Sequence, residues 1–263
     1  MGFPVVVGLE IGQEKLVYTN SQGRVLGTRA ILPDGRVFRW ALNAAVAIEA
    51  GKLVQTAAEV GGSIHVNGLA VVNATVTGVT TITVTMATTP TVANQYADGD
   101  MVVDTSPGQA MYRIKSHQAA DSGADAQFVL YESDEIKNAL TSGTSTVGFR
   151  RNPYTSVIIA PTTITGAPIG VTPINVPAST AAILQYFWLQ TWGLCMVNMD
   201  QAPVAGKRVI TGILSAGHLD ISSTSSADTT GANEASSYPQ IGIAQTGGAG
   251  ADKYHRVFLT ISP

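Results

Sequence analysis

Apolar and polar residues alternate with a period of two along several short stretches of the chain. In segment 80–86, threonines at every second position separate Ile82, Val84 and Met86, which would put the apolar side chains on one face of a β-strand. Other segments rich in Val, Ile, Tyr, Phe or Thr are predicted strands as well. They are 99–104, 111–116, 127–132, 156–160, 184–191, 194–198, 208–212, 240–245 and 256–262. The pattern predicts an all-β fold with a β-barrel or β-sandwich body.

Helical patterns are few and short. Segment 40–50 is rich in Ala and ends at Gly51, and segment 134–140 has polar and apolar positions that suit about two helical turns. Prolines at 161, 168, 173 and 177 predict an extended connection without regular structure over 161–180. Small polar residues over 222–237 predict a long irregular loop.

Charged residues are distributed unevenly, which suggests how the chain is organised. No Asp, Glu, Lys or Arg occurs in 60–97 or in 152–199, although a sheet with one solvated face normally alternates apolar with charged residues. Uncharged faces of Thr, Ser and Asn suit contact with another protein, so we expect a homo-oligomer, most simply a homotrimer. We divide the chain into an N-terminal arm (1–58) and two β-rich regions (59–150 and 151–263), which together could form one continuous domain.

The N-terminal region contains only short, scattered apolar groups. No stretch in 1–58 is long and periodic enough to build a core of its own, so we expect an extended arm that lies along neighbouring subunits. Met1–Gly12 lacks a basic segment and its apolar run is interrupted by Glu10. We therefore expect no secretory signal.

Composition excludes several classes of protein. Of 263 residues, 45% are hydrophobic and 13% are charged, which argues against disorder and against a coiled coil. The net charge of −3 gives no basic footprint for nucleic acid. The best uncharged window, 181–199, contains Gln185, Gln190 and Asn198 and has no flanking cations, so we expect no membrane span. The single cysteine, Cys195, is expected to be a small buried apolar residue.

A search for catalytic and metal-binding patterns yields only weak candidates. The histidines, at 65, 117, 218 and 255, lack the close spacing of metal ligands. His218 and Asp220 would share a strand face that His255 could approach, although isolated histidines are the simpler interpretation. The acidic segments 98–104 and 121–125 are incomplete as calcium loops, and 246–252 lacks the Lys of a phosphate loop. We expect no enzyme, no cofactor and no metal.

Two groups of residues are candidates for contact with a partner. The first is a basic and aromatic cluster that follows an Asp-Gly turn, and hot spots of protein interfaces are enriched in such residues. Its members are Arg36, Phe38, Arg39 and Trp40. The alternative is that the two aromatic residues enter the chain's own core while both arginines are solvated. The second group is Trp188 with Trp192, four residues apart, which on a regular strand would share a face as a carbohydrate platform, or else pack in a core or interface.

Three sets of segments together resemble the capsid decoration (cement) proteins of tailed bacteriophages. The first set is 32–41 (LPDGRVFRWA) and 50–55 (AGKLVQ); the second is 94–103 (NQYADGDMVV), 112–117 (YRIKSH) and 152–154 (NPY); the third is 186–193 (YFWLQTWG), 241–244 (IGIA) and 257–261 (VFLTI). The resemblance spans roughly residues 30–263, and these are patterns of a structural protein without a catalytic fingerprint.

The resemblance implies a β-rich structural protein on the outer capsid surface of the virion, often trimeric, that joins neighbouring capsomers. Its partners would be the major capsid protein and further copies of itself, with no nucleic acid and no membrane. Many decoration proteins are much smaller than this chain, which leaves room for another role. The alternative is a head-fibre or tail-associated glycan-binding protein of a phage.

Overall fold

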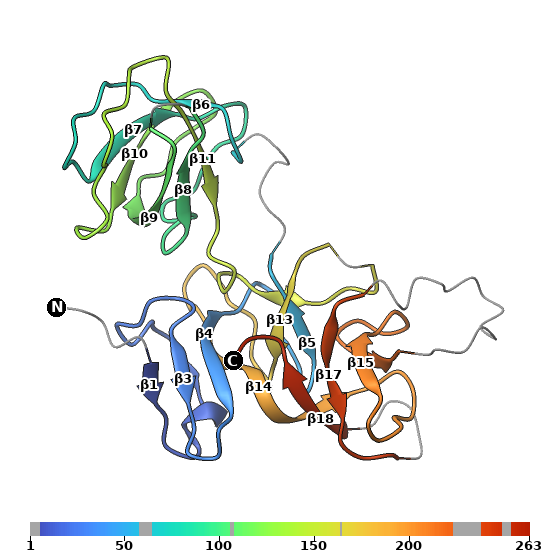
Figure 1. Ribbon diagram of the computed structural model, residues 1–263. Coiled ribbons are helices and arrows are strands. Elements are labelled where there is room, and N and C mark those ends of the chain that lie inside the picture. The colour runs from blue at the N-terminus through green and yellow to red at the C-terminus, as the bar shows by residue number, and fades with distance from the viewer. Residues whose placement is uncertain (1–5, 58–64, 106–107, 164, 223–237, 249–253) are drawn as a thin grey trace. The chain divides into compact units, whose positions relative to one another are not determined.

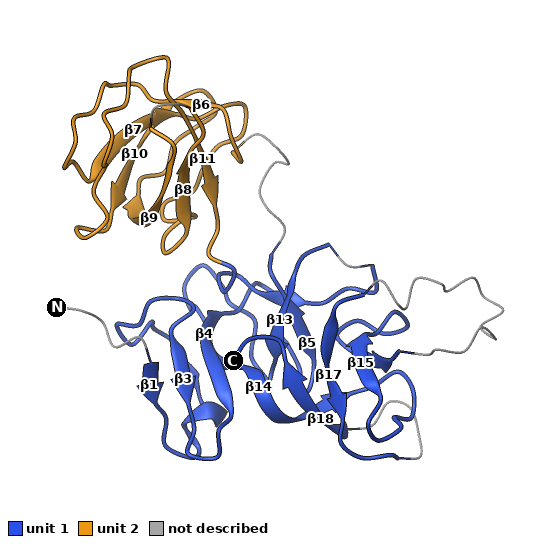
Figure 2. Cartoon of the chain, in the orientation of Figure 1, with its two compact units in different colours: residues 1–58, 153–263 blue, residues 59–152 orange. Residues whose placement is uncertain are grey.

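The computed structural model describes residues 6–57, 65–105, 108–163, 165–222, 238–248 and 254–263. The chain forms two compact units (Figure 2): unit 1 comprises residues 1–58 and 153–263, and unit 2 comprises residues 59–152. The boundaries expected near residues 58 and 150 therefore coincide closely with the ends of unit 2. The segments on either side of it, which we had separated, belong to one unit.

Unit 2 is a six-stranded sheet with the order β6-β11-β8-β9-β10-β7 (Figure 1). The strands are β6 (Leu69–Ala70), β7 (Thr81–Thr85), β8 (Asp100–Val103), β9 (Ala110–His117), β10 (Asp125–Leu130) and β11 (Thr146–Arg150). Just after β6, Val71 forms an antiparallel bridge with Val84, and the Val72 N–H donates to the Thr83 carbonyl at 2.9 Å. The two ends of the strand order thus meet, and the sheet curls into a small barrel.

The barrel interior holds the apolar side chains that the alternating pattern predicted. Ile82, Val84 and Met86 are buried while the threonines between them are not. Phe128 stacks on Phe149 with ring centroids 4.0 Å apart. The predicted strands 99–104, 111–116 and 127–132 are confirmed as β8, β9 and β10.

Two buried histidines are held in the same barrel by hydrogen bonds at both ring nitrogens. His117 Nε2 accepts the Tyr96 N–H at 2.9 Å, and its Nδ1 lies 2.8 Å from the Gln118 carbonyl. His65 Nδ1 lies 2.6 Å from the Tyr96 hydroxyl, and its Nε2 lies 2.9 Å from the Thr89 carbonyl. A neutral imidazole satisfies both contacts of His117, whereas a proton added to its Nε2 would leave the Tyr96 N–H facing another donor.

Unit 2 is expected to lose stability below about pH 6.5. Burial, with a smaller contribution from nearby His65, lowers the pKa of His117 below 6.5. The unfolded chain therefore binds a proton at a pH where the folded chain does not, so the free energy of unfolding falls toward acid by up to about 1.4 kcal/mol per pH unit. Amide hydrogen exchange of β9 and β10 measures it. In the His117→Gln variant, the free energy of unfolding should fall less steeply toward acid. An unchanged dependence on pH would contradict the role given to His117.

Unit 1 is a twelve-stranded sheet whose main path runs β1-β3-β4-β14-β18-β17-β15-β16. The strands are β1 (Val6–Gly8), β2 (Val17–Tyr18), β3 (Arg29–Ile31), β4 (Val37–Leu42), β5 (Leu53–Gln55), β12 (Ile158–Ile159), β13 (Pro168–Val171), β14 (Tyr186–Asn198), β15 (Arg208–Thr211), β16 (Leu219–Ile221), β17 (Gln240–Ala244) and β18 (Tyr254–Thr260). The 3₁₀ turn η1 (Gln13–Lys15) lies between β1 and β2. β14 is the hub, since it pairs with β2, β4, β13 and β18.

The second half of β14 belongs to a curled part of this sheet. Met199, just after β14, forms a parallel bridge with Leu219 of β16, so the path β14-β18-β17-β15-β16 returns to its start. Cys195 and Val197 point into the resulting core together with Val257 and Leu259 of β18. The expected strands 208–212, 240–245 and 256–262 are confirmed, and 184–191 and 194–198 are one continuous strand.

The prediction of an extended N-terminal arm was wrong, because these residues are part of unit 1. Residues from 6 onward supply β1 to β5, and Leu9, Leu32, Phe38 and Trp40 are buried in the core of unit 1. The arm looked coreless because its short apolar groups pack against β14, which lies far along the chain.

The prediction of two short helices was also wrong, because their residues form a strand end, turns and bridges. Residues 40–42 end β4, and 43–50 form turns and isolated bridges; residues 134–140 form turns and the bridge of Leu140 to Thr75. The connection 161–180 contains β13, which pairs with β5 and β14, so the expectation of no regular element there was wrong. The long loop expected at 222–237 lies outside the described residues, apart from Ser222.

Candidate interaction face of unit 1

The aromatic residues of the predicted contact cluster are buried. Phe38 and Trp40 of β4 and Trp188 of β14 have no exposed surface. Trp40 lies 4.8 Å from Trp188 and stacks on Tyr186 at 5.9 Å between ring centroids. These residues form the chain's own core, so their prediction as an exposed anchor was wrong and the core-packing alternative holds.

The core-packing alternative also expected Arg36 and Arg39 to be solvated, and on this point the structure differs. Arg39 donates to the Gly27 carbonyl at 3.3 Å and to the Ser262 hydroxyl at 3.1 Å, which ties β4 to the end of the chain. Arg36 lies in the turn before β4 and pairs with Asp34 and Glu14. Arg39 is therefore a structural residue, and Arg36 is the member of the cluster that reaches a surface hollow.

Trp188 and Trp192 do not share a face of β14. Trp188 pairs with Trp40 and Gln190 with Phe38, but Trp192 pairs with Val37, so Thr191 is an extra residue that forms a β-bulge. Because a bulge reverses the alternation of the strand, Trp192 lies on the face opposite Trp188. The shared face expected from their spacing was therefore wrong, and with it the carbohydrate-platform alternative, whereas the core packing also expected holds for Trp188.

Beyond the bulge, β14 and its neighbours carry an apolar outer face. Cross-strand pairing places Leu194 beside Phe258, Phe258 beside Ile243, and Met196 beside Arg256. Exposed fractions are 41% for Leu194, 48% for Met196, 38% for Ile243 and 53% for Tyr254. We call this surface the β14 face: Trp192, Leu194 and Met196 of β14, Tyr254, Arg256 and Phe258 of β18, and Ile243 of β17.

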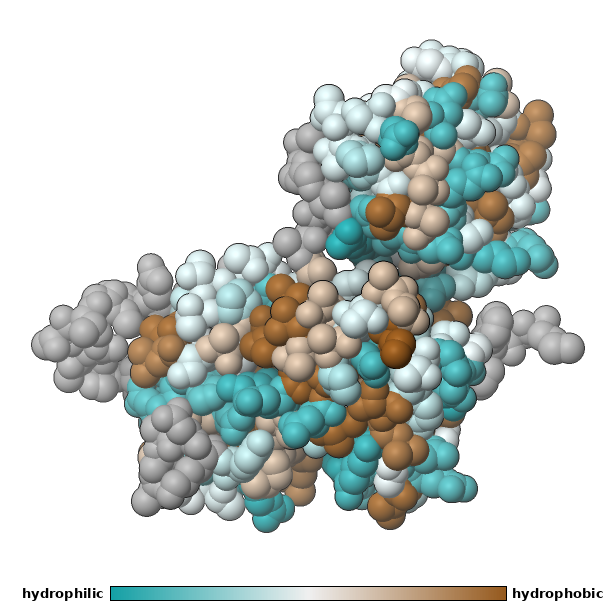
Figure 3. All heavy atoms as spheres, turned by 180° about the vertical axis from the view of Figure 1, so that it is seen from behind, coloured by the Kyte–Doolittle hydropathy of each residue, from teal (hydrophilic) through white to brown (hydrophobic). Residues whose placement is uncertain are grey.

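Exposed apolar side chains also occur elsewhere on the chain, but on the β14 face they are brought side by side by strand pairing. Trp192 packs edge-on against Phe258 with ring centroids 5.5 Å apart, which fixes one end of the face. Figure 3 shows hydrophobic and hydrophilic residues side by side on one face of unit 1. Contiguous exposed apolar side chains bordered by polar ones are typical of protein interaction sites.

One border of the β14 face is a cleft around Arg36. A hollow of about 200 Å³ is lined by residues from η1, the β3–β4 turn, β14 and β18, among them Glu14, Lys15, Gln190 and Arg256. A second hollow of about 500 Å³, lined by Asp34, Gly193 and Phe258 among others, shares Arg36 and Leu194 with the first. We call the two together the Arg36 cleft.

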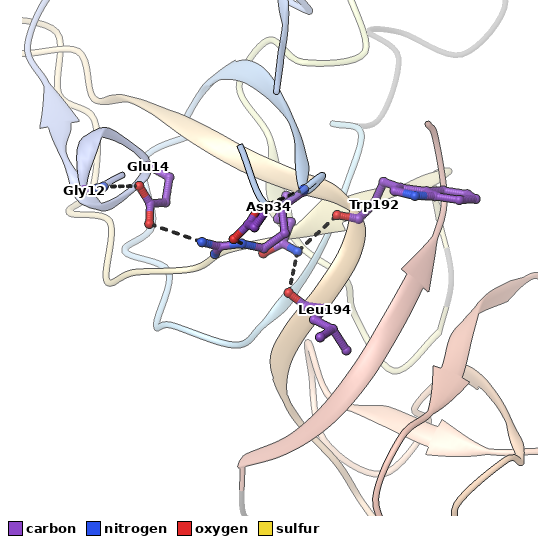
Figure 4. Close-up of polar contacts among 7 residues, drawn as sticks. Gly12, Glu14, Asp34, Trp192 and Leu194 are labelled. Carbon is purple, nitrogen blue, oxygen red and sulfur yellow. Dashed lines mark hydrogen bonds and ion pairs between the residues drawn. The ribbon is translucent and has the colours of Figure 1, made fainter. Parts of the chain in front are cut away.

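Polar contacts hold the walls of the Arg36 cleft in place. Arg36 Nε lies 2.7 Å from Asp34 Oδ2, and Arg36 Nη2 lies 3.6 Å from Glu14 Oε1 (Figure 4). Burial would raise the pKa of Asp34, but hydrogen bonds from the Arg36 N–H and guanidinium outweigh it and lower that pKa. The Gln190 amide donates to the carbonyls of Trp192 and Leu194, at 3.1 and 2.8 Å. The Gln190 side chain thus fixes the backbone of β14 beyond the bulge.

Cys195 borders the cleft but is not a reactive thiol. It is buried, and burial raises its pKa to about 12, so the thiol stays protonated at neutral pH. This confirms the expectation of a small apolar residue.

Gly193→Ala is expected to distort the Arg36 cleft and to lower the free energy of unfolding of unit 1 by about 2 kcal/mol. Gly193 has φ +88°, and an added Cβ would lie 3.1 Å from Arg36 Cγ and 3.3 Å from Arg36 Cα. Gly206→Ala is the matched control, because Gly206 has φ +80° with nothing within 4 Å. Urea unfolding followed by tryptophan fluorescence compares the two, and equal costs would contradict a contact with Arg36.

The histidine and acidic candidates have structural partners. His218 Nδ1 lies 3.1 Å from Asp200 Oδ1, while Asp220 accepts from Gln201 at 3.3 Å. The weaker alternative, in which His218 and Asp220 act together, is not supported by these contacts. Asp200 Oδ2 also accepts the N–H groups of Leu214 and Ser215. In the part of the chain that the structure describes, no three His, Cys, Asp or Glu side chains converge as metal ligands would.

The acidic segments of unit 2 are likewise used within the fold. Asp98 accepts the Tyr131 hydroxyl at 2.5 Å, Asp104 accepts the Gly68 N–H at 2.8 Å, and Asp125 accepts the Thr85 hydroxyl at 2.8 Å. These carboxylates fix turns and strand ends.

Comparison with protein families, with curated proteins and with solved structures finds no match to the chain. Within the described ranges, no helix has the length and apolar character needed to cross a membrane. The interaction face is therefore interpreted from its own geometry.

Proposed function

We propose that this chain is a non-enzymatic virion structural protein, a decoration protein that binds the major capsid protein on the outside of a tailed-phage head. The single observation that carries the proposal is the β14 face. It presents four side chains that are about two-fifths to one-half exposed and apolar, on a rigid, paired part of the sheet. A surface of this kind gains free energy when a partner removes it from water.

Two features of the sequence support the same role. The resemblance to decoration proteins includes segments of β14, β17 and β18, which form this face. The two long uncharged runs support a homo-oligomer, most simply a homotrimer at local three-fold positions of the head. The glycan-binding alternative has no comparable support, because its tryptophan pair lies on opposite faces of β14.

Leu194→Thr with Met196→Thr is expected to weaken binding to heads that lack this protein by at least about tenfold. Both side chains are exposed on the β14 face, and threonine retains strand propensity while removing apolar contact area. Cosedimentation with the heads measures the effect. Leu214→Thr is the matched control, since Leu214 is 68% exposed in the β15–β16 turn.

Two results would overturn the proposal. One is a parent protein that fails to bind the heads but binds or cleaves host polysaccharide. The other is quantitative mass spectrometry of virions that finds tens of copies or fewer per particle, where a decoration protein should reach the order of hundreds.

A further inference from the structure

We propose that the Arg36 cleft recognises an acidic peptide segment of the partner, with a carboxylate side chain held by Lys15 and Arg256 and a neighbouring apolar residue packed on Leu194 and Met196. The inference rests on the proposed function to the extent that the partner is a protein of the head. It adds the chemistry by which that partner is recognised.

The charges of the cleft favour an acidic ligand. Three cations and one carboxylate line the smaller hollow, and Arg36 is already neutralised by Asp34 and Glu14. Lys15 and Arg256 are exposed and form no ion pair with any described residue. In a chain whose net charge is −3, two unneutralised cations beside an apolar face select an acidic partner and reject a basic one.

The buried carboxylate of Glu14 requires a donor as well. Its Oε2 accepts the Gly12 N–H at 2.6 Å, but its Oε1 accepts no hydrogen bond from the described residues. The side chain is only 1% exposed, and the nearest cation, Arg36 Nη2, is 3.6 Å away. A buried acceptor without a donor is unfavourable. Glu14 Oε1 has almost no exposed surface, so a peptide N–H could relieve this cost only after a neighbouring side chain moves aside.

Together these features distinguish a peptide from other anions. A peptide carries N–H donors close to its acidic side chain, whereas a phosphodiester backbone carries acceptors alone. The two hollows also share Arg36 and Leu194 as lining residues, so they lie next to each other along β14, which suits an extended segment. The apolar side chains at the rim, Leu194 and Met196, favour a protein over a nucleic acid.

The first test reverses the charge of Lys15 and Arg256, the two cleft cations that form no ion pair with any described residue. Lys15→Glu with Arg256→Glu should weaken binding to heads at least about tenfold and abolish most of its dependence on sodium chloride. Lys137→Glu with Lys207→Glu changes the net charge equally at exposed sites outside the cleft and should bind as the parent does. Arg256→Lys should retain binding. A cleft variant with the parent's affinity and salt dependence would overturn the inference but leave the proposed function intact.

The second test does not depend on phage heads. The full chain is titrated, by NMR, with an acetylated and amidated hexapeptide of two central glutamates flanked by leucines, and with its glutamine counterpart. Amide shifts of β14 and Arg256 should occur with the glutamate peptide and be lost in the cleft variant. Equal shifts from both peptides, no shift from either, or stronger competition by single-stranded DNA would each overturn the inference, even if head binding itself is confirmed.

Discussion

Trp188→Ala is expected to lower the free energy of unfolding of unit 1 by about 3–5 kcal/mol. The side chain has no exposed surface and packs against Trp40 across the β4–β14 pairing. Removing the indole would leave a cavity beside Trp40 in the core that covers this face of the β4–β14 pair, and strands held in register by hydrogen bonds cannot move to fill it. The loss therefore combines the lost burial of apolar surface with the cost of the cavity.

Tryptophan fluorescence is a selective measurement for this experiment, because Trp40, Trp188 and Trp192 all lie in unit 1. Urea unfolding of the variant is followed through the two remaining tryptophans. Trp192→Ala is the internal comparison, since Trp192 is partly exposed and packs edge-on against Phe258. Its cost should be less than half that of Trp188→Ala. Equal costs would mean that Trp188 is not the core residue described here.

Much of the β-structure could be predicted from sequence, where one strand carries its own signal. β7 alternates threonine with apolar residues, and β8 and β9 are bounded by turn residues. The short strands β1, β3 and β5 carry no such signal, because each has three residues. Their position is determined by pairing with distant segments, so a local reading of 1–58 suggested an arm where the structure has part of a core.

The two expected helices failed for a related reason. Segment 40–50 has the Ala content of a helix, but Trp40 and Ala41 pair with Trp188 and Phe187 of β14. Burial of these aromatic residues outweighs a helix preference of a few tenths of a kcal/mol per residue. Local propensity contains no information about a partner strand almost 150 residues away.

The interaction face could be anticipated only in part. Arg36 and Trp192 were singled out from their residue types, and both lie at the cleft or on the β14 face. The bulge at Thr191, which separates Trp192 from Trp188, leaves no mark in the residue spacing. Lys15 and Arg256 are 241 positions apart in the sequence, so only the fold brings them to one hollow.

Gly148→Ala is expected to be the most damaging single substitution in unit 2, with a loss above about 4 kcal/mol or failure of that unit to fold. A Cβ at this position would overlap the backbone carbonyl of Val66 and approach Asn67 Cα. No flexible side chain can move to relieve the overlap. The same segment is fixed to β11 by the Phe149 N–H, which donates to the His65 carbonyl at 2.7 Å, and by the Arg150 guanidinium on the Val66 carbonyl.

Displacing residues 65–67 would therefore break these bonds and disturb His65 at the same time. Amide hydrogen exchange of β8 and β11 measures the effect on unit 2, while tryptophan fluorescence reports separately on unit 1. Gly143→Ala is the matched control, because Gly143 has φ +67° with nothing within 4 Å and should lose only about 1–2 kcal/mol from backbone strain. If Gly148→Ala costs no more than this control, then segment 65–67 does not lie against β11 as described.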